Sequence, residues 1–120
     1  MGSKLLFVDD EESIHKILRR VFEGQSYSLL DAYNGEDAIK VAEKEVPDLI
    51  LLDINMPKMD GYDVIRELRK NKTTRNIPIL MLTGNGDVVD KVVGYELGVE
   101  DYVTKPFHTD HIRLHVESLL

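Results

Sequence analysis

The sequence has no cysteine, no tryptophan and no long apolar run. Without cysteine, the chain cannot form a disulfide, a thiolate metal site or a cysteine nucleophile, and it needs no oxidising compartment. No apolar stretch approaches the roughly 20 residues that cross a bilayer, and the N-terminus lacks the pattern of a signal peptide. These absences predict a cytoplasmic protein that does not enter a membrane.

Positive charge is also scarce, since 15 Lys and Arg residues stand against 22 Asp and Glu residues, for a formal net charge of -7. This excess of negative charge disfavours attraction to nucleic acid, so we expect no direct nucleic-acid binding by this domain. The chain has 120 residues, of which 42% are hydrophobic and 31% charged. Such values are typical of one globular unit, and we predict a single domain over residues 1–120.

Short apolar segments alternate with segments of helical periodicity along the chain. We predict strands at residues 4–8, 27–33, 49–52, 77–82 and 101–104, and helices at residues 14–22, 35–46, 61–70, 87–97 and 109–120. Each strand–helix–strand unit makes a right-handed crossover that returns the chain to the same direction. The alternation therefore predicts a doubly wound α/β domain, with a parallel five-stranded sheet and helices on both faces.

Polar residues follow four of the five predicted strands, namely Asp9, Asp10, Asp53, Thr83 and Lys105. In doubly wound sheets, ligands bind outside the carboxyl ends of the strands. Three carboxylates in one crevice would repel one another and be pushed toward protonation unless a cation neutralised them. Because all the donors are oxygens, the sequence favours Mg2+ at this place, and Mn2+ is also acceptable.

A divalent cation beside an aspartate, a lysine and a hydroxyl is suited to the chemistry of a phosphoryl group. The cation and Lys105 can neutralise phosphoryl oxygens while Asp53 attacks in line and forms an acyl phosphate. The Thr83 hydroxyl can reach a further phosphoryl oxygen, and the Asn55 main-chain oxygen can serve as another metal ligand.

Four sequence stretches together resemble the receiver domains of two-component response regulators, over essentially the whole chain. They are FVDDEE at 7–12, LLDINMPKMDG at 51–61, LTG at 82–84 and GYELGVEDYVTKPF at 94–107. The resemblance implies a flavodoxin-like (βα)5 fold with strand order 2-1-3-4-5. It also implies a phosphorylation-dependent signalling switch that receives its phosphoryl group from a histidine kinase or a histidine phosphotransfer protein. Such a domain catalyses only its own phosphorylation and dephosphorylation, so we expect no enzyme that acts on other substrates.

The resemblance also implies roles for the residues around the acidic cluster. Asp53 would be the phosphoacceptor. Asp10 would bind Mg2+ directly, Asp9 mainly through water, and Asn55 through its main-chain oxygen. Asn55 and Asn85, each two positions after a site residue, would tune the lifetime of the phosphoryl group.

A second group of roles concerns the residues that would respond to phosphorylation. Lys105 would pair with the phosphoryl group, and it precedes Pro106 in a peptide bond that is usually cis in this family. Thr83 and Tyr102 would form the switch pair. The threonine hydroxyl would move toward the phosphoryl group, and the tyrosine ring would turn inward to fill the space left behind.

The predicted helix at 87–97 contains more apolar side chains than one buried stripe needs, among them Val88, Val89, Val92 and Val93. Apolar residues that cannot all be buried mark a surface for a partner. We therefore expect a readout surface on the fourth helix, fifth strand and fifth helix, with a homodimer through this surface as a hypothesis.

Three other functions compete with this interpretation. A phosphatase of the haloacid-dehalogenase type has an aspartate nucleophile, but it needs a second aspartate at the position of Asn55. A flavin or nucleotide carrier would need a glycine-rich phosphate loop, and no such motif is present. A receiver-like scaffold that is never phosphorylated gains little support, because all the expected site residues are present.

His108, His111 and His115 recur at helical spacing in the last predicted helix. Three imidazoles can bind Zn2+, but no HExxH pattern accompanies them, and solvent-facing histidines are the commoner case.

Overall fold

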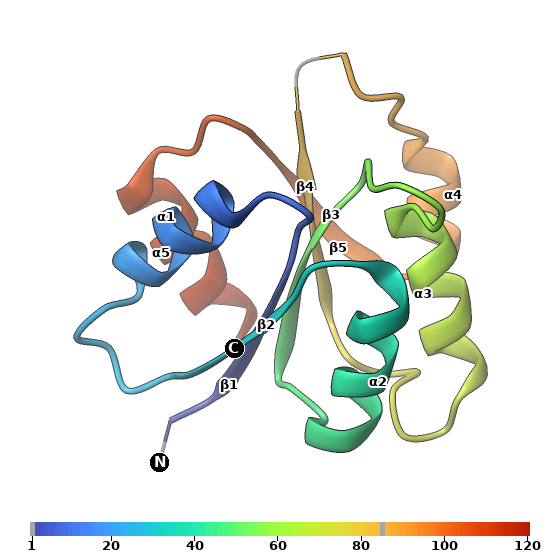
Figure 1. Cartoon of the computed structure of the whole chain (residues 1–120), viewed down its shortest axis with the longest axis horizontal. Coiled ribbons are helices and arrows are strands. Elements are labelled where there is room, and N and C mark those ends of the chain that lie inside the picture. The colour runs from blue at the N-terminus through green and yellow to red at the C-terminus, as the bar shows by residue number, and fades with distance from the viewer. Residues whose placement is uncertain (1, 85) are drawn as a thin grey trace.

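The computed structural model describes residues 2–84 and 86–120. Five strands and five helices alternate along these residues (Figure 1): β1 (Lys4–Val8), α1 (Glu12–Val21), β2 (Ser28–Ala32), α2 (Gly35–Glu45), β3 (Leu49–Asp53), α3 (Gly61–Lys70), β4 (Ile79–Thr83), α4 (Lys91–Glu96), β5 (Val99–Thr104) and α5 (Thr109–Leu119). Among these helices, none has the length and hydrophobicity that would let it cross a membrane.

The strands form one parallel sheet in the order β2-β1-β3-β4-β5, which confirms the predicted fold and strand order. Figure 1 shows α1 and α5 on one face of the sheet and α2, α3 and α4 on the other. β3 lies at the centre of the sheet between β1 and β4, and all five of its residues are buried.

The buried side chains of β3 divide between two hydrophobic cores. Leu49 and Leu51 pack in the core that contains residues of α1 and α5, whereas Ile50 and Leu52 pack in the core under α2 and α3. Because both faces of a parallel strand are covered, its sequence is continuously apolar. Asp53 therefore stands at the end of a strand that is fixed from both sides.

Two helices of the larger core begin with side-chain caps. The Asn34 side chain accepts the Asp37 N–H at 2.8 Å before α2. Before α3, Asp60 accepts the Asp63 N–H at 2.9 Å, and Asp63 accepts the Asp60 N–H at 3.1 Å. Such reciprocal capping satisfies donors at a helix start that would otherwise lack partners. α3 consequently has the bounds that the sequence predicted.

The prediction of a helix over residues 87–97 was wrong at its start, because α4 begins only at Lys91. The Asp87 carboxylate accepts the Gly84 N–H, and Asp90 accepts the Val93 N–H at 3.1 Å as the helix cap. Aspartate side chains that bond to nearby backbone favour turns and caps over helix interiors. Residues 87–90 therefore form a loop, and Val88 and Val89 belong to that loop.

The strand predictions differ from the structure only at their ends. β4 covers Ile79–Thr83 where 77–82 was predicted, so Thr83 belongs to the strand itself. β5 begins at Val99, two residues before its predicted start. Pro78 precedes β4, and its carbonyl accepts the Ile50 N–H at 3.1 Å. The residues at the carboxyl ends of the strands remain those that the sequence indicated.

Gly61 is expected to be essential for the close approach of α3 to the end of β3. A Cβ atom at Gly61 would lie 2.7 Å from the Asp53 carbonyl oxygen and 3.0 Å from the Ile54 Cα, both of which belong to backbone. Overpacking of this kind costs about 1–3 kcal/mol. We expect Gly61→Ala to lower the free energy of unfolding in urea, although alanine favours a helix over glycine by about 1 kcal/mol.

The control for this measurement is Gly84→Ala, since the three atoms nearest to a Cβ there belong to the Asp87 carboxyl group, the closest at 3.3 Å, and not to backbone. The Asp87 carboxylate needs to shift by only a few tenths of an ångström, which keeps its bond to the Gly84 N–H, so this variant is expected to unfold at nearly the same urea concentration as wild type. Equal midpoints for both variants and wild type would contradict the tight packing of α3 on β3.

Candidate functional site

Three carboxylates meet at the carboxyl ends of β1 and β3. Asp9 and Asp10 follow β1, Asp53 ends β3, and the two strands are neighbours in the sheet. One carboxylate oxygen from each residue lies within 4.8 Å of those of the other two. Asp9 and Asp53 are buried, at 0% and 3% exposure, while Asp10 is exposed. This acidic trio, Asp9, Asp10 and Asp53, is an oxygen-only donor set of the kind that Mg2+ prefers.

Lys105 brings a cation into the acidic trio from the end of β5. Its Nζ lies 2.7 Å from Asp9 Oδ2 and 3.2 Å from Asp53 Oδ1. Burial alone would lower the pKa of Lys105, but its hydrogen bonds and charge interactions with Asp9 and Asp53 outweigh burial and raise the pKa. Lys105 therefore stays protonated and joins the two buried carboxylates.

Both carboxylate oxygens of Asp9 have donors within the protein. Oδ1 accepts the Glu11 N–H at 2.9 Å, and Oδ2 accepts from Lys105. Its main-chain carbonyl also accepts from His15 Nε2 at 2.8 Å. Asp9 is therefore the most firmly held member of the acidic trio.

The surroundings of Asp53 disfavour its ionisation. Burial, followed by the charge of Asp9, raises its pKa from 3.8 to about 6, against the opposing effects of Lys105 and the Asn55 N–H. A second cation close to Asp53 would offset the repulsion from Asp9. The three carboxylates of the acidic trio are thus only partly neutralised by Lys105, so these residues are suited to bind a divalent cation.

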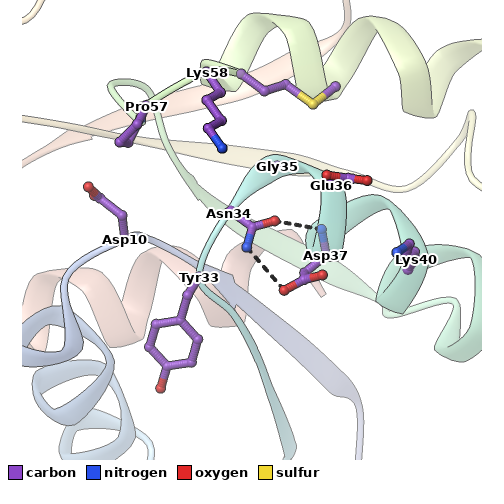
Figure 2. A pocket seen from close by; sticks show the side chains of 10 residues that line it. Asp10, Tyr33, Asn34, Gly35, Glu36, Asp37, Lys40, Pro57 and Lys58 are labelled. Atoms are coloured by element: carbon purple, nitrogen blue, oxygen red, sulfur yellow. Dashed lines mark hydrogen bonds between the residues drawn. The ribbon is translucent and has the colours of Figure 1, made fainter.

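A cavity of about 510 Å3 opens beside Asp10. Figure 2 shows Asp10 at its edge, with Tyr33 and Asn34 before α2 on one side and Pro57 and Lys58 from the loop after β3 on the other. The cavity leaves Asp10 open to solvent, so a hydrated ion can reach its carboxylate.

The hydroxyls of the predicted switch pair contact groups outside the acidic trio in this structure. Thr83 is buried, and its hydroxyl donates to the Val103 carbonyl at 3.4 Å. The Tyr102 hydroxyl lies 3.2 Å from the Tyr62 hydroxyl and packs against Gly94 of α4, where a Cβ would come within 1.8 Å of it. The structure thus brings Asp9, Asp10, Asp53 and Lys105 together, and it places Tyr102 over α4.

The remaining predicted residues border this site or lie outside the described part of the chain. Asn55 is exposed, and its backbone N–H bonds to the Asp53 carboxylate. The Lys105–Pro106 peptide bond is cis, as the resemblance implies. Asn85 lies outside the described residues.

Sequence reasoning missed His15, which supports Asp9 from α1. His15 is 1% exposed; its Nδ1 lies 2.7 Å from Asp31 Oδ1 and its Nε2 2.8 Å from the Asp9 carbonyl oxygen. The carbonyl oxygen of Asp9 can only accept, so Nε2 donates to it. A histidine on the inner side of an amphipathic helix gives no sequence signal of such contacts, because Asp31 and Asp9 come from other elements.

Tyr62 was missed for the same reason, and it is expected to hold the start of α4. Its hydroxyl accepts the Asp90 N–H at 2.9 Å and lies 3.2 Å from the Asp90 carbonyl oxygen. Tyr62→Phe leaves that N–H without its acceptor and should lower the free energy of unfolding by about 1 kcal/mol. The amides at the start of α4 should also exchange hydrogen faster, which amide exchange followed by NMR measures.

Tyr95→Phe provides the matched control, because Tyr95 is 76% exposed on the same helix. It should leave both stability and exchange unchanged. If Tyr62→Phe also left the exchange of the Asp90 and Lys91 amides unchanged, the hydroxyl would not hold α4.

The sheet order, the acidic trio and the lysine after β5 define a class of α/β domain with a carboxylate cluster at one edge of a parallel sheet, and comparison with known families agrees. The model of the response regulator receiver domain matches residues 5–117. The chain belongs to this family.

Among curated relatives, the alkaline phosphatase synthesis transcriptional regulatory protein PhoP of Bacillus subtilis (strain 168) is 47% identical over 120 residues. That match covers 100% of this chain and 49% of PhoP. The chain spans about half the length of the curated relatives it matches.

Solved receiver structures have the same fold. The chemotaxis protein CheY4 of Vibrio cholerae superposes with a TM-score of 0.90 at 28% identity, covering 100% of both chains. The receiver domain of the sensor histidine kinase PA1611 from Pseudomonas aeruginosa PAO1 gives 0.87 at 28% identity, covering 99% of this chain and 98% of that one. The PA1611 structure has a magnesium ion coordinated in its active site cleft.

Proposed function

We propose that this domain is a phosphorylation-dependent switch in which Asp53 accepts a phosphoryl group from a partner's phosphohistidine, in a reaction that needs Mg2+. The observation that carries the proposal is the meeting of the acidic trio with Lys105, which lies 2.7 Å from Asp9 and 3.2 Å from Asp53. The magnesium ion in the active site cleft of PA1611, a domain of the same fold, supports the choice of cation.

Asp10, Asp53 and the Asn55 main-chain oxygen would hold the cation directly. Asp9 would act mainly through water, because both its carboxylate oxygens already accept hydrogen bonds from Glu11 and Lys105. When bound, Mg2+ supplies positive charge that neutralises the carboxylates and the transferring phosphoryl group. Mn2+, which also accepts oxygen ligands, would serve in its place.

Asp53 supplies the nucleophile. Its carboxylate oxygen forms a bond to phosphorus as the phosphorus–nitrogen bond of the phosphohistidine breaks, and a donor ring protonated on its other nitrogen leaves as neutral imidazole. Burial fixes the Asp53 side chain at the end of β3, so the attacking oxygen needs little reorganisation. Lys105 would then exchange its contact with Asp53 for one with a phosphoryl oxygen.

The switch would follow from new partners for Thr83 and Lys105. In the structure, the Thr83 hydroxyl donates to the Val103 carbonyl. A phosphoryl group on Asp53 would compete for this donor, and Tyr102 would leave its place against Gly94 to fill the space that Thr83 vacates. A phosphoryl group can bias two conformations only through such differential contacts. Asn55 and Asn85 would tune the lifetime of the phosphoryl group.

The partners would be a histidine kinase or a histidine phosphotransfer protein, with a second copy of this domain on the output side. Val88, Val92 and Tyr95, on α4 and the loop before it, are 88%, 69% and 76% exposed and would form the centre of a homodimer over α4, β5 and α5. By likeness to the transcriptional regulator PhoP, the switch would serve transcriptional control. Sedimentation with and without beryllofluoride tests the dimer, and an unchanged mass would refute it.

Two alternatives make different predictions for the same site. A phosphatase of the haloacid-dehalogenase type would turn over external phosphate esters, yet Asn55 stands where its second aspartate is needed. An unphosphorylated scaffold would ignore phosphoryl donors altogether. The switch is favoured over the phosphatase by Asn55, and over the scaffold by the contact of Lys105 with Asp9 and Asp53 in the acidic trio.

Intact mass spectrometry with acetyl phosphate separates these functions. With Mg2+, we expect the protein to gain the mass of one phosphoryl group, which is lost again on standing. With a chelator in place of Mg2+, we expect no gain. A protein that never gains this mass is a scaffold, and one that releases phosphate from many donor equivalents without a rise in mass is a phosphatase.

A further inference from the structure

One cavity on the β5 and α5 side of the domain is lined by three histidines and one aspartate. It has a volume of about 290 Å3, and its lining includes Asp101, His108, His111 and His115. Asp101 belongs to β5, His108 precedes α5, and the other two histidines lie one turn apart on α5. The sequence indicated the three imidazoles, and the fold adds a carboxylate from a different element.

We propose that His111, His115 and Asp101 form a second metal site, for Zn2+ or a similar transition metal, separate from the acidic trio. The inference does not depend on the proposed phosphorylation, since none of these residues belongs to the phosphoacceptor chemistry.

The contact between His115 and Asp101 already has the spacing of two metal ligands. His115 Nε2 lies 3.2 Å from Asp101 Oδ2. Ligand atoms bound tetrahedrally to zinc at about 2.0–2.1 Å lie about 3.3 Å from each other. Zn2+ can therefore bind between these two atoms without a large movement of either side chain.

The Asp101 carboxylate is held in the orientation that such a site needs. Its Oδ1 accepts the Tyr102 N–H at 2.8 Å, so Oδ2 is the oxygen that faces His115. Hydrogen bonds of this kind orient metal ligands and commonly contribute 10–100-fold, in order of magnitude, to metal affinity. At 56% exposure, the Asp101 side chain also leaves the ion a path from solvent.

His111 supplies the third ligand from the adjacent turn. The rings of His111 and His115 are stacked, with centroids 6.0 Å apart and planes at 23°. Histidines at i and i+4 lie on one helix face, the spacing by which two imidazoles bind one zinc ion in HExxH sites. Among the described residues, only the acidic trio already holds three possible ligand atoms within 4.8 Å of one another. His111, which is exposed, must therefore turn its ring toward the pair.

The donor chemistry distinguishes the two sites. Imidazole nitrogens suit Zn2+, Cu2+ and Ni2+, whereas carboxylates and carbonyl oxygens suit Mg2+ and Mn2+. Zn2+ is thus expected to occupy the histidine site while an excess of Mg2+ occupies the acidic trio. A bound ion would join α5 to β5 beside Tyr102. If the proposed switch operates, the ion would stiffen the surface of α4, β5 and α5 that the switch uses.

Calorimetric titration of the protein with ZnCl2 in a large excess of Mg2+ tests the proposal. We expect one equivalent of Zn2+ to bind. His111→Ala and Asp101→Asn are each expected to weaken that binding by at least about tenfold. Asp110→Asn is the matched control, because Asp110 lies at the start of the same helix with a 79% exposed side chain, and it should bind Zn2+ like wild type.

The acidic trio provides the second control, since the Asp10→Asn protein should still bind one equivalent of Zn2+ with the affinity of wild type. Because His111 and Asp101 are exposed, their replacement should not disturb folding, which circular dichroism checks. Two results would overturn the proposal: no Zn2+ bound above the Mg2+ background, or binding that is weakened by Asp10→Asn and unaffected by His111→Ala.

Discussion

Replacing Asp53 with asparagine is expected to abolish phosphoryl acceptance and, in metal-free buffer, to make the folded protein more stable. The amide has no carboxylate oxygen with which to attack phosphorus, so the gain of mass from acetyl phosphate should disappear. The gain in stability has a separate cause. In the folded protein, Asp53 is 3% exposed and close to Asp9, and asparagine removes a charge that this environment disfavours.

The pH dependence of this effect follows from the pKa of Asp53, which burial, followed by the charge of Asp9, raises from 3.8 to about 6. Between these values the folded state binds more protons than the unfolded state, so stability falls as pH rises. The stability that the protonated Asp53 side chain gives the folded state is fully present below pH 3.8, and it is lost once the pH exceeds about 6. At about 1.4 kcal/mol for each pH unit between the two pKa values, ionisation of Asp53 costs the folded state about 3 kcal/mol at most.

We therefore expect Asp53→Asn to raise the free energy of unfolding by about 1–3 kcal/mol at neutral pH, and by nearly nothing at pH 4. Urea unfolding in the presence of a chelator measures both values. Asp110→Asn, on the surface, should leave the free energy of unfolding unchanged at both pH values. An Asp53→Asn protein that is less stable than wild type at neutral pH would show that Lys105 fully compensates the Asp53 charge.

Replacing Lys105 with methionine is expected to have the opposite effect on stability and a similar effect on phosphorylation. Its Nζ is the cation between Asp9 and Asp53, and its side chain is only 15% exposed. Removal of one partner from a buried ion pair leaves an uncompensated charge and costs about 3–5 kcal/mol. We expect a loss of that order at neutral pH without metal. Phosphoryl acceptance should fall by about 10²–10³-fold, as for the removal of one charge-stabilising donor.

The double variant Asp53→Asn with Lys105→Met tests whether the two residues act through each other. Because Asp53 has lost its cation in the Lys105→Met protein, we expect Asp53→Asn to stabilise that protein by more than it stabilises wild type. Lys70→Met is the surface control. The Lys70 side chain pairs with Glu67 and is 72% exposed, so its replacement should change the free energy of unfolding by less than about 0.5 kcal/mol. Additive effects of Asp53→Asn and Lys105→Met would contradict a direct coupling.

The sequence predicted the fold well because local patterns and chain topology both point to it. The apolar run before Asp53 is continuous since β3 is covered on both faces, and the carboxyl ends of parallel strands necessarily meet. α3 has its predicted bounds because its first turn carries a complete capping box. The start of α4 was predicted wrongly, because the side chain of Asp87 bonds to the Gly84 N–H and starts a turn that apolar periodicity does not reveal.

Other contacts that the sequence did not predict join residues from separate elements. His15 bonds to Asp31 and to the carbonyl of Asp9, Tyr62 bonds to Asp90, and His115 pairs with Asp101. None of these pairs lies at a spacing that helical or strand periodicity would bring together. Likewise, the position of Thr83 at a strand end was predictable, but the direction of its hydroxyl depends on the Val103 carbonyl of the neighbouring strand.

The central claim is that Asp53 carries the phosphoryl group. It is tested most directly by phosphorylating the protein from a phosphohistidine donor in the presence of Mg2+, reducing the product with borohydride and mapping the modified residue by peptide mass spectrometry. An acyl phosphate is reduced to the alcohol, so the modification marks the acceptor. We predict that Asp53 alone is converted, and only when Mg2+ is present. Conversion at Asp10 or another carboxylate, or none at all, would contradict the account.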